Sequence, residues 1–217
     1  MCIRRFREPT SGLTHLAAAL LSLLGLIWLI VVARDDVARV VTLSVYGLSM
    51  VALYLASAVY HLTPGSPHVL NTLVRLDRVG IFLLIAGTYT PLVYHFTGGA
   101  WRWGLLTVVW AMALGGSLYT LFVYRRERSK KVWMTLFYVG MGCVGVVSAP
   151  HMLNQMPPGA MWLILGGGAV YIAGAVVYTL EKPNFHRYFN FHDLWHLFVM
   201  AASALFFTAI LVFVAMA

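Results

Sequence analysis

Two histidines four residues apart begin the last apolar stretch of the chain, within the segment FHDLWHLFV. On an α-helix, His192 and His196 lie on one face about 6 Å apart along the axis, so both rings can point at one centre. His61, at the end of the second apolar stretch, offers a third imidazole. Three imidazoles form a ligand set used by catalytic zinc sites, which leave a fourth position for water. The residue types therefore predict a zinc centre held by His61, His192 and His196.

Two further polar residues have the chemistry to act beside such a metal. Asp77 offers a carboxylate that can hold and deprotonate a water molecule whose pKa a zinc ion lowers to about 7. Ser57 precedes His61 by one helical turn, so its hydroxyl can hydrogen-bond that water, Asp77 or a substrate carbonyl. Zinc is favoured over calcium or magnesium because the first shell is nitrogen rather than oxygen.

The elements that must position these residues are membrane helices. Of the 217 residues, 61% are apolar and 10% are charged, which leaves too few polar side chains to cover a soluble globule. Seven apolar stretches each approach the roughly 20 residues that a membrane-spanning helix needs. They cover residues 13–33, 39–61, 76–95, 101–124, 132–149, 160–180 and 193–216. The sequence predicts an all-α membrane protein in which residues 1–217 form a single domain of seven transmembrane helices.

The distribution of Lys and Arg predicts the orientation of this bundle. With the N-terminus in the cytoplasm, the inner segments hold twelve of these residues and the outer segments three, as expected when cytoplasmic loops retain positive charge. The C-terminus then lies outside, and in a bacterium the membrane would be the plasma (inner) membrane. The net charge of +8 does not indicate a nucleic-acid partner, because the basic residues form short clusters between apolar stretches. We expect membrane lipids as partners, and the oligomeric state stays open.

This topology places the polar residues at one depth of the membrane. His61 ends a helix that runs toward the cytoplasm, whereas Asp77 and the later histidine pair begin helices that run away from it. Glu8 and His15, at the start of the first helix, join the same layer in roles that the sequence leaves open. Ionisable residues within a span are costly and usually face a cavity or one another, so this layer predicts a single polar site. A simpler alternative is that the histidines bind no metal and only hydrogen-bond across the bundle or reach lipid headgroups.

Asp193 stands beside the histidine pair but has a different expected role. It lies about 100° around the helix from His192, so its carboxylate cannot share the direction of the two imidazoles. A carboxylate in the first turn is well placed to cap a helix N-terminus. We therefore expect Asp193 to cap the last helix and not to bind the metal.

Four segments together resemble the sequence blocks of the hemolysin III branch of the progestin and adipoQ receptor family. They read EPTSGLTH, SAVYHL, LDRVGIFLLIAGTYTP and FHDLWHLFV, they follow the order of that family, and the resemblance covers essentially the whole chain. The resemblance implies a seven-helix bundle with a cytoplasmic N-terminus and a zinc ion held by His61, His192 and His196. The serine and aspartate of the family fall on Ser57 and Asp77. It gives no ligand role to His15.

Two functions of different classes are compatible with these features. The first is a zinc-dependent hydrolase that cleaves an amide or ester of a lipid entering sideways from the bilayer, and relatives with ceramidase-like activity favour an amide. The second is a non-enzymatic regulator or sensor of lipid state, or a hemolysin or channel-like protein, in which zinc bolts the second helix to the seventh. The predicted spans contain no obvious ring of charges through both leaflets, as a charged pore would need.

Overall fold

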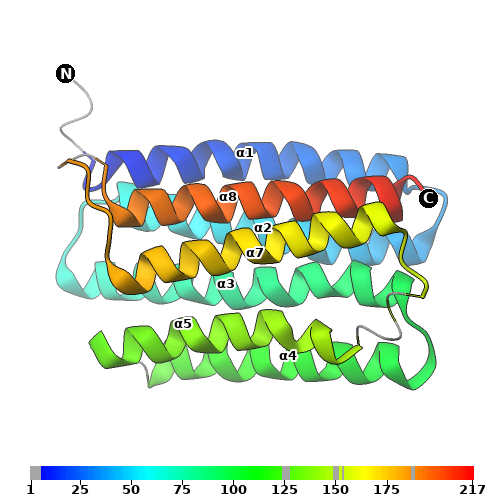
Figure 1. Cartoon of the computed structure of the whole chain (residues 1–217). Coiled ribbons are helices and arrows are strands. Elements are labelled where there is room, and N and C mark those ends of the chain that lie inside the picture. The colour runs from blue at the N-terminus through cyan, green and yellow to red at the C-terminus, as the bar shows by residue number, and fades with distance from the viewer. Residues whose placement is uncertain (1–5, 124–127, 149–151, 153, 187–188) are drawn as a thin grey trace.

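In the part of the chain that the structure describes, seven α-helices run side by side along a common direction (Figure 1). The computed structural model describes residues 6–123, 128–148, 152, 154–186 and 189–217. The helices are α1 (Pro9–Val32), α2 (Val37–Leu62), α3 (Pro67–Phe96), α4 (Gly99–Phe122), α5 (Arg128–Cys143), α7 (Pro158–Leu180) and α8 (Phe191–Ile210). A 3₁₀ segment, Val144–Ser148, follows α5, and a π-helical turn, Leu211–Ala215, follows α8. The prediction of an all-α bundle of seven helices is confirmed.

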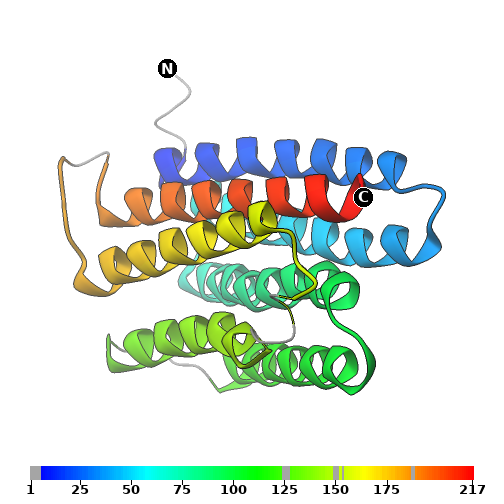
Figure 2. The ribbon, with the colours of Figure 1, turned by 45° about the vertical axis from the view of Figure 1, so that its right-hand side comes forward.

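The helices pack in an order that differs from their order in the chain. Helix α1 packs on α2 and α8, α2 packs on α3, α3 packs on α4, and α7 packs on α8, while α5 contacts α3 and α7. The two views of the ribbon show the α4–α5 pair on the side of the bundle opposite α1 (Figures 1 and 2). Helix α1 begins at one end of the bundle, and the C-terminus lies at the other end (Figure 1). We call the end at which α1, α3 and α8 begin and α2 finishes the near end.

The outer surface of the bundle is suited to lipid. Among the described residues, five helices are long and apolar enough to cross a membrane, namely α1, α2, α4, α7 and α8 with its π-helical turn. The outward face of α1 is apolar, because Leu20, Leu21, Leu24 and Trp28 are all exposed. Exposed apolar surface on this scale is stable in a bilayer and not in water. The chain is therefore a multi-pass integral membrane protein.

Helix α3 extends well beyond the apolar stretch at residues 76–95. It begins at Pro67, whose ring fits the first turn of a helix, and the Ser66 hydroxyl accepts a hydrogen bond from the Val69 amide at 3.5 Å. Its first turns carry charged residues, so hydropathy alone underestimates its length. Helix α5 is shorter than the stretch at 132–149 because the backbone tightens to 3₁₀ after Cys143. The expected helix ends at 124 and 149 lie outside the described residues.

Two glycines on α3 bring this helix unusually close to α2. A Cβ atom at Gly87 would lie 2.1 Å from the Ser49 hydroxyl oxygen, and one at Gly80 would lie 2.8 Å from the Cα of Leu53. Both separations are shorter than any ordinary carbon contact, which is about 3.5–4.0 Å. Only a residue without a Cβ permits this approach. The close packing brings the C-terminal half of α2 against the N-terminal half of α3, where Ser57, His61 and Asp77 lie.

Candidate metal centre

Three imidazoles from two helices meet inside the near end of the bundle. His61 lies in the last turn of α2, and His192 and His196 lie in the first two turns of α8. One side-chain nitrogen from each ring lies within 4.8 Å of the other two. The Nε2 atom of His192 is 3.4 Å from that of His61 and 3.1 Å from that of His196. His61 and His196 are only 1% and 3% exposed, whereas His192 is partly exposed.

The geometry and chemistry of this cluster fit a metal ion. Zn–N bonds of about 2.0–2.1 Å in a tetrahedral centre place neighbouring nitrogens roughly 3.3 Å apart, close to the two separations between Nε2 atoms. A proton on one of these nitrogens can serve only one neighbour, so hydrogen bonds cannot satisfy three nitrogens that face one another. Three protonated rings would repel one another. A cation that accepts all three lone pairs resolves both problems.

Glu8, the residue that precedes the first turn of α1, fixes the orientation of His61. Its carboxylate forms an ion pair with the Nδ1 atom of His61, and its backbone amide donates a hydrogen bond of 3.0 Å to the His61 carbonyl. A carboxylate that holds Nδ1–H leaves the lone pair on Nε2, the atom that faces the cluster. Burial of the Glu8 carboxylate by itself raises its pKa. The hydrogen bond to His61 and the charge of His61 together lower the pKa by more than burial raises it, so the pKa of Glu8 lies below its ordinary value.

Ser57 and Asp77 lie next to the histidines, on facing helices. The Asp77 carboxylate is half-buried and lies within electrostatic reach of His61, with the Ser57 hydroxyl beside it. Ser57 is 1% exposed, and its oxygen makes no hydrogen bond of ordinary geometry within the part of the chain that is described. Buried hydroxyls nearly always have a partner. The Asp77 carboxylate is the hydrogen-bonding neighbour of this hydroxyl, and both residues line the same cavity.

Asp193 caps α8, in a position where it cannot also bind the metal. One carboxylate oxygen accepts a hydrogen bond from the Asn190 amide at 2.9 Å, and the Asn190 side chain accepts one from the His192 amide at 2.8 Å. This reciprocal arrangement is a capping box. The other oxygen of Asp193 accepts a hydrogen bond of 2.6 Å from the Ser11 hydroxyl on α1. Both oxygens are thus occupied in holding the turn that carries His192.

The sequence relationships agree with this architecture. The family model described as "Haemolysin-III related" matches residues 3–207. The chain belongs to this family. It is 36% identical over 209 residues to "Hemolysin-3" of Bacillus cereus, covering 95% of this chain and 91% of that protein. It is 31% identical over 206 residues to "Hemolysin-3 homolog" of Bacillus subtilis (strain 168), covering 94% and 92%. "Progestin and adipoQ receptor-like protein 1" of Caenorhabditis elegans is 25% identical over 170 residues, which are 71% of this chain and 39% of that protein.

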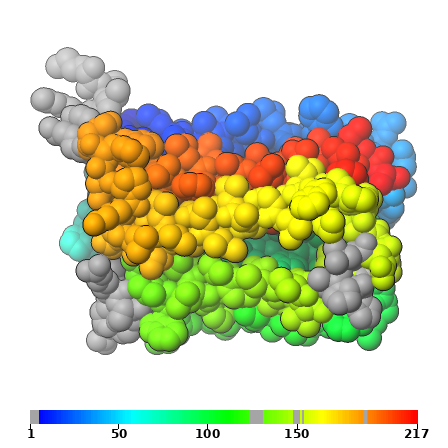
Figure 3. Space-filling view, in the orientation of Figure 1, coloured from blue at the N-terminus to red at the C-terminus, as the bar shows by residue number. Residues whose placement is uncertain are grey.

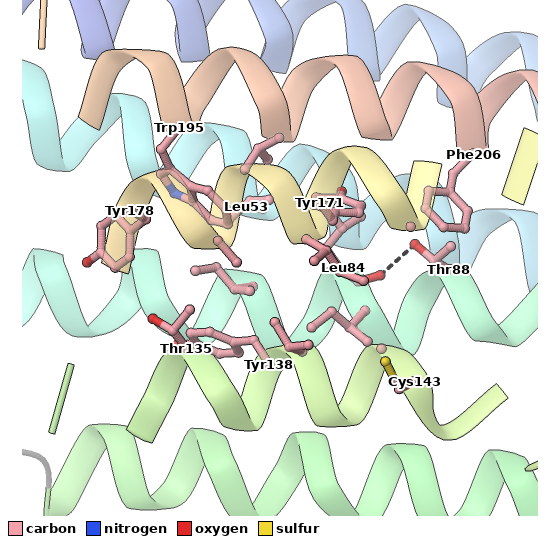
Figure 4. Close-up of a pocket in the computed structure, with 18 of the residues that line it drawn as sticks. Leu53, Leu84, Thr88, Thr135, Tyr138, Cys143, Tyr171, Tyr178, Trp195 and Phe206 are labelled. Carbon is pink, nitrogen blue, oxygen red and sulfur yellow. Dashed lines mark hydrogen bonds between the residues drawn. The ribbon is translucent and has the colours of Figure 1, made fainter. Parts of the chain in front are cut away.

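In this haemolysin-III family member, a large cavity runs from the histidines toward the middle of the bundle. Its volume is about 880 Å³. Polar residues line it at the near end, including Ser57, Asp77, His192 and His196. Figure 4 shows the deeper wall, where side chains from α2, α3, α5, α7 and α8 converge, among them Leu53, Leu84, Tyr138 and Phe206. Most of the lining is apolar, but Thr88 and Tyr171 add hydroxyl groups to the deeper wall (Figure 4).

His15 lies in the polar layer that the sequence predicted, but the sequence did not predict its contacts there. Its ring lies flat on the ring of His196, with centroids 3.7 Å apart and planes inclined by 12°, and the Tyr54 ring meets it edge-on at 5.0 Å. The site also includes Ser11 and Tyr54, which sequence reasoning missed. Neither has a residue type or spacing that indicates a role. The sequence segment EPTSGLTH, at the start of α1, could have indicated these residues, because Glu8, Ser11 and His15 all belong to it.

Proposed function

We propose that this protein is a zinc-dependent membrane hydrolase that cleaves an amide or ester bond of a lipid near the cytoplasmic face. The observation that carries this proposal is the convergence of three imidazole nitrogens at the polar end of a large apolar cavity. A zinc ion held by His61, His192 and His196 would lower the pKa of a water molecule to about 7 and polarise a substrate carbonyl. Nitrogen ligands favour zinc over magnesium and calcium.

The residues around the histidines have separate tasks in this proposal. Asp77 lies within electrostatic reach of His61 and lines the cavity, so its carboxylate accepts a proton from the attacking water and returns it to the leaving group. Ser57 lines the cavity next to Asp77 with a hydroxyl that lacks a regular partner within the described residues. Its O–H donates to the carbonyl oxygen of the substrate, where negative charge develops during attack. Glu8 holds His61 in the tautomer that presents Nε2.

Substrate reaches the site from the side in this proposal. The space-filling view shows a hollow between the surfaces of α7 and α5, through which deeper residues are visible (Figure 3). Cavity-lining residues come from both of these helices, among them Met134 and Tyr138 of α5 and Ile164 and Ile172 of α7. An acyl chain in the cavity would contact mainly apolar side chains along most of its length. This arrangement favours a lipid substrate over a water-soluble one.

A structural zinc is the second candidate, and one feature favours it. The three imidazoles join the end of α2 to the start of α8, so a bound metal ties together two helices that lie far apart in the chain. In that case the protein is a regulator or sensor of lipid state. Metal removal would then lower the melting temperature, and no lipid product would form.

Metal analysis followed by a lipid screen separates these functions. We expect zinc in the purified wild-type protein and its loss in His192→Ala and His196→Ala. His95→Ala is the matched control, because His95 lies at the opposite end of α3 and contacts the Thr42 hydroxyl at 3.2 Å. Zinc in equal amounts in the wild type and His192→Ala would refute the site. A screen of amide and ester lipids then tests activity. Lipid turnover that persists when His192 and His196 are both replaced by Ala would refute the hydrolytic mechanism.

A further inference from the structure

Helix α1 contributes no nitrogen to the cluster of three histidines, yet residues at its start contact two of these histidines and the cap of the helix that carries the third. Glu8, Ser11 and His15 follow the spacing i, i+3, i+7, which places Ser11 and His15 on one side of α1 and Glu8, the residue before the helix, in line with them. Glu8 pairs with His61, His15 stacks on His196, and Ser11 donates a hydrogen bond to Asp193 in the cap beside His192. These three residues thus reach the last turn of α2 and the first turns of α8, which carry the proposed ligands.

The stack between His15 and His196 is the most unusual of these contacts. His15 is 3% exposed, and neither of its ring nitrogens makes a regular hydrogen bond to any described residue. The His196 backbone lies near the His15 ring, but outside ordinary hydrogen-bond geometry. The Nδ1 atom of His196 also has no such bond, although the backbone of Ser11 approaches it. The flat face of His15 is therefore one of the contacts that set the plane of the His196 ring, beside the rings of His61 and His192 at centroid distances of 4.8 and 4.7 Å.

Close packing of α1 holds this face in place. A Cβ atom at Gly12 would lie 2.5 Å from the Leu62 side chain and 3.3 Å from the Cβ of His61. Tyr54 meets His15 edge-on and donates its own hydroxyl to Ser203 at 2.8 Å. His15 is thus clamped between α2 and α8. A clamped ring prevents rotation of the ring that lies against it, because close-packed interiors leave no space for such rotation.

We propose that the Glu8–Ser11–His15 face of α1 is a positioning layer that sets the metal affinity of the centre, and that His15 orients His196 by stacking. The proposal rests on the metal centre put forward above. His15 is a positioning residue and not a fourth ligand, because stacking turns its face, and not a nitrogen lone pair, toward His196. Outer groups that hydrogen-bond to metal ligands orient them in many proteins, and their loss typically weakens metal binding about 10–100-fold. We expect the stacked ring of His15 to act on the same scale.

Variants of His15 test the stack directly. We expect His15→Ala to weaken zinc affinity about 10–100-fold, measured on the purified protein by competition with a chelator. His15→Phe keeps a flat ring without nitrogens, so its affinity should stay within a few-fold of the wild type. Ser22→Ala is the control, because Ser22 is buried farther along α1, away from the cluster. The visible spectrum of the cobalt-substituted protein supplies a second readout, which should change in His15→Ala and persist in His15→Phe.

Glu8→Gln tests the same layer without disturbing the core. The Glu8 side chain is 49% exposed, so the variant should fold and yet bind zinc about 10–100-fold more weakly. The melting temperature of the metal-free proteins separates an effect on folding from an effect on the metal. Equal affinity in wild type and His15→Ala, or equal losses in His15→Ala and His15→Phe, would overturn the stacking role alone. A wild-type protein that binds no zinc would overturn this inference and the proposed function together.

Discussion

Two adjacent glycines on α4 offer a matched test of how the outer pair of helices is attached to the site. Gly115 is exposed, and a Cβ atom there would meet nothing within 4 Å. Gly116 is buried, and a Cβ atom there would lie 2.4 Å from two carbons of the Phe82 ring on α3. Phe82 is fully buried and packs against the rings of Phe137 and Tyr138 on α5 at 5.6 and 4.6 Å. The ring therefore cannot swing away from an added methyl group.

The same substitution should have opposite effects at these two positions. Gly→Ala within a helix gains about 1 kcal/mol of helix propensity, so Gly115→Ala should raise stability by roughly that amount. At Gly116 the overlap with Phe82 exceeds 1 Å relative to an ordinary contact of about 3.5–4.0 Å. Overpacking of this kind costs about 1–3 kcal/mol, which removes the gain and leaves Gly116→Ala up to about 2 kcal/mol less stable than the wild type.

Thermal unfolding of the two purified variants in the same detergent measures this difference. Gly115→Ala should melt above the wild type and Gly116→Ala at or below it. Tyr138 lines the cavity and donates a hydrogen bond of 3.2 Å to the Arg78 carbonyl, so a displaced Phe82 should also reduce lipid turnover in Gly116→Ala. If both variants gained the same stability, the Phe82 ring would have room to move, and the inference that α3 and α4 are too close for a side chain at position 116 would be refuted.

Three further predictions concern the cap, the cavity and pH. Asn190→Ala should destabilise the first turn of α8 by about 1 kcal/mol and weaken zinc binding at His192. Asn190→Asp keeps a capping oxygen, so it should preserve the stability of this turn and the zinc affinity. Thermal melting measures the stability, and competition with a chelator measures the affinity. Gly168 lines the cavity, and a Cβ atom there meets nothing within 4 Å. Gly168→Phe should therefore fill part of the cavity and raise KM for long-chain lipids without changing the zinc content. Equal KM values in the wild type and Gly168→Phe would show that the lipid binds elsewhere. The Asp36 carboxylate caps α2, and the Arg39 amide holds its pKa below the ordinary value. Its contribution to stability is therefore present above its unfolded pKa, near pH 4, and is lost as pH falls through the lower folded value. Asp36→Asn keeps the cap without the charge, so the melting temperature of the wild type should fall more steeply than that of the variant in acid.

Apolar stretches were sufficient to predict the number of helices and insufficient to predict their ends. Helix α3 begins at Pro67, because Ser66 and Pro67 supply local start signals that hydropathy does not register. Arg75, Asp77 and Arg78 then interrupt its apolar character, although the helix continues through them. The reason is that these residues face the cavity or neighbouring helices, and not the lipid. Hydropathy measures average polarity along the chain and carries no information on which side of a helix a charge lies.

Depth in the membrane was a better guide to the site than sequence spacing alone. Spacing put His192 and His196 on one face of a helix, and the direction of each span put His61 and Asp77 at the same level. The structure brings these side chains together at the near end of the bundle. Their metal and catalytic roles remain proposals. The prediction that Asp193 caps α8 agrees with the capping box and with the Ser11 hydroxyl that occupies its second oxygen.

The contacts of α1 were beyond the reach of sequence reasoning for a physical reason. Helix periodicity places Glu8, Ser11 and His15 on one side of α1, but it does not identify the helix against which that side packs. That choice depends on close approach at Gly12 and on the order in which the helices surround one another. Once α1 lies between α2 and α8, the same three residues reach the elements that carry all three proposed ligands. The polar layer predicted from membrane depth then divides into residues that face the metal position and residues of α1 that hold them in place.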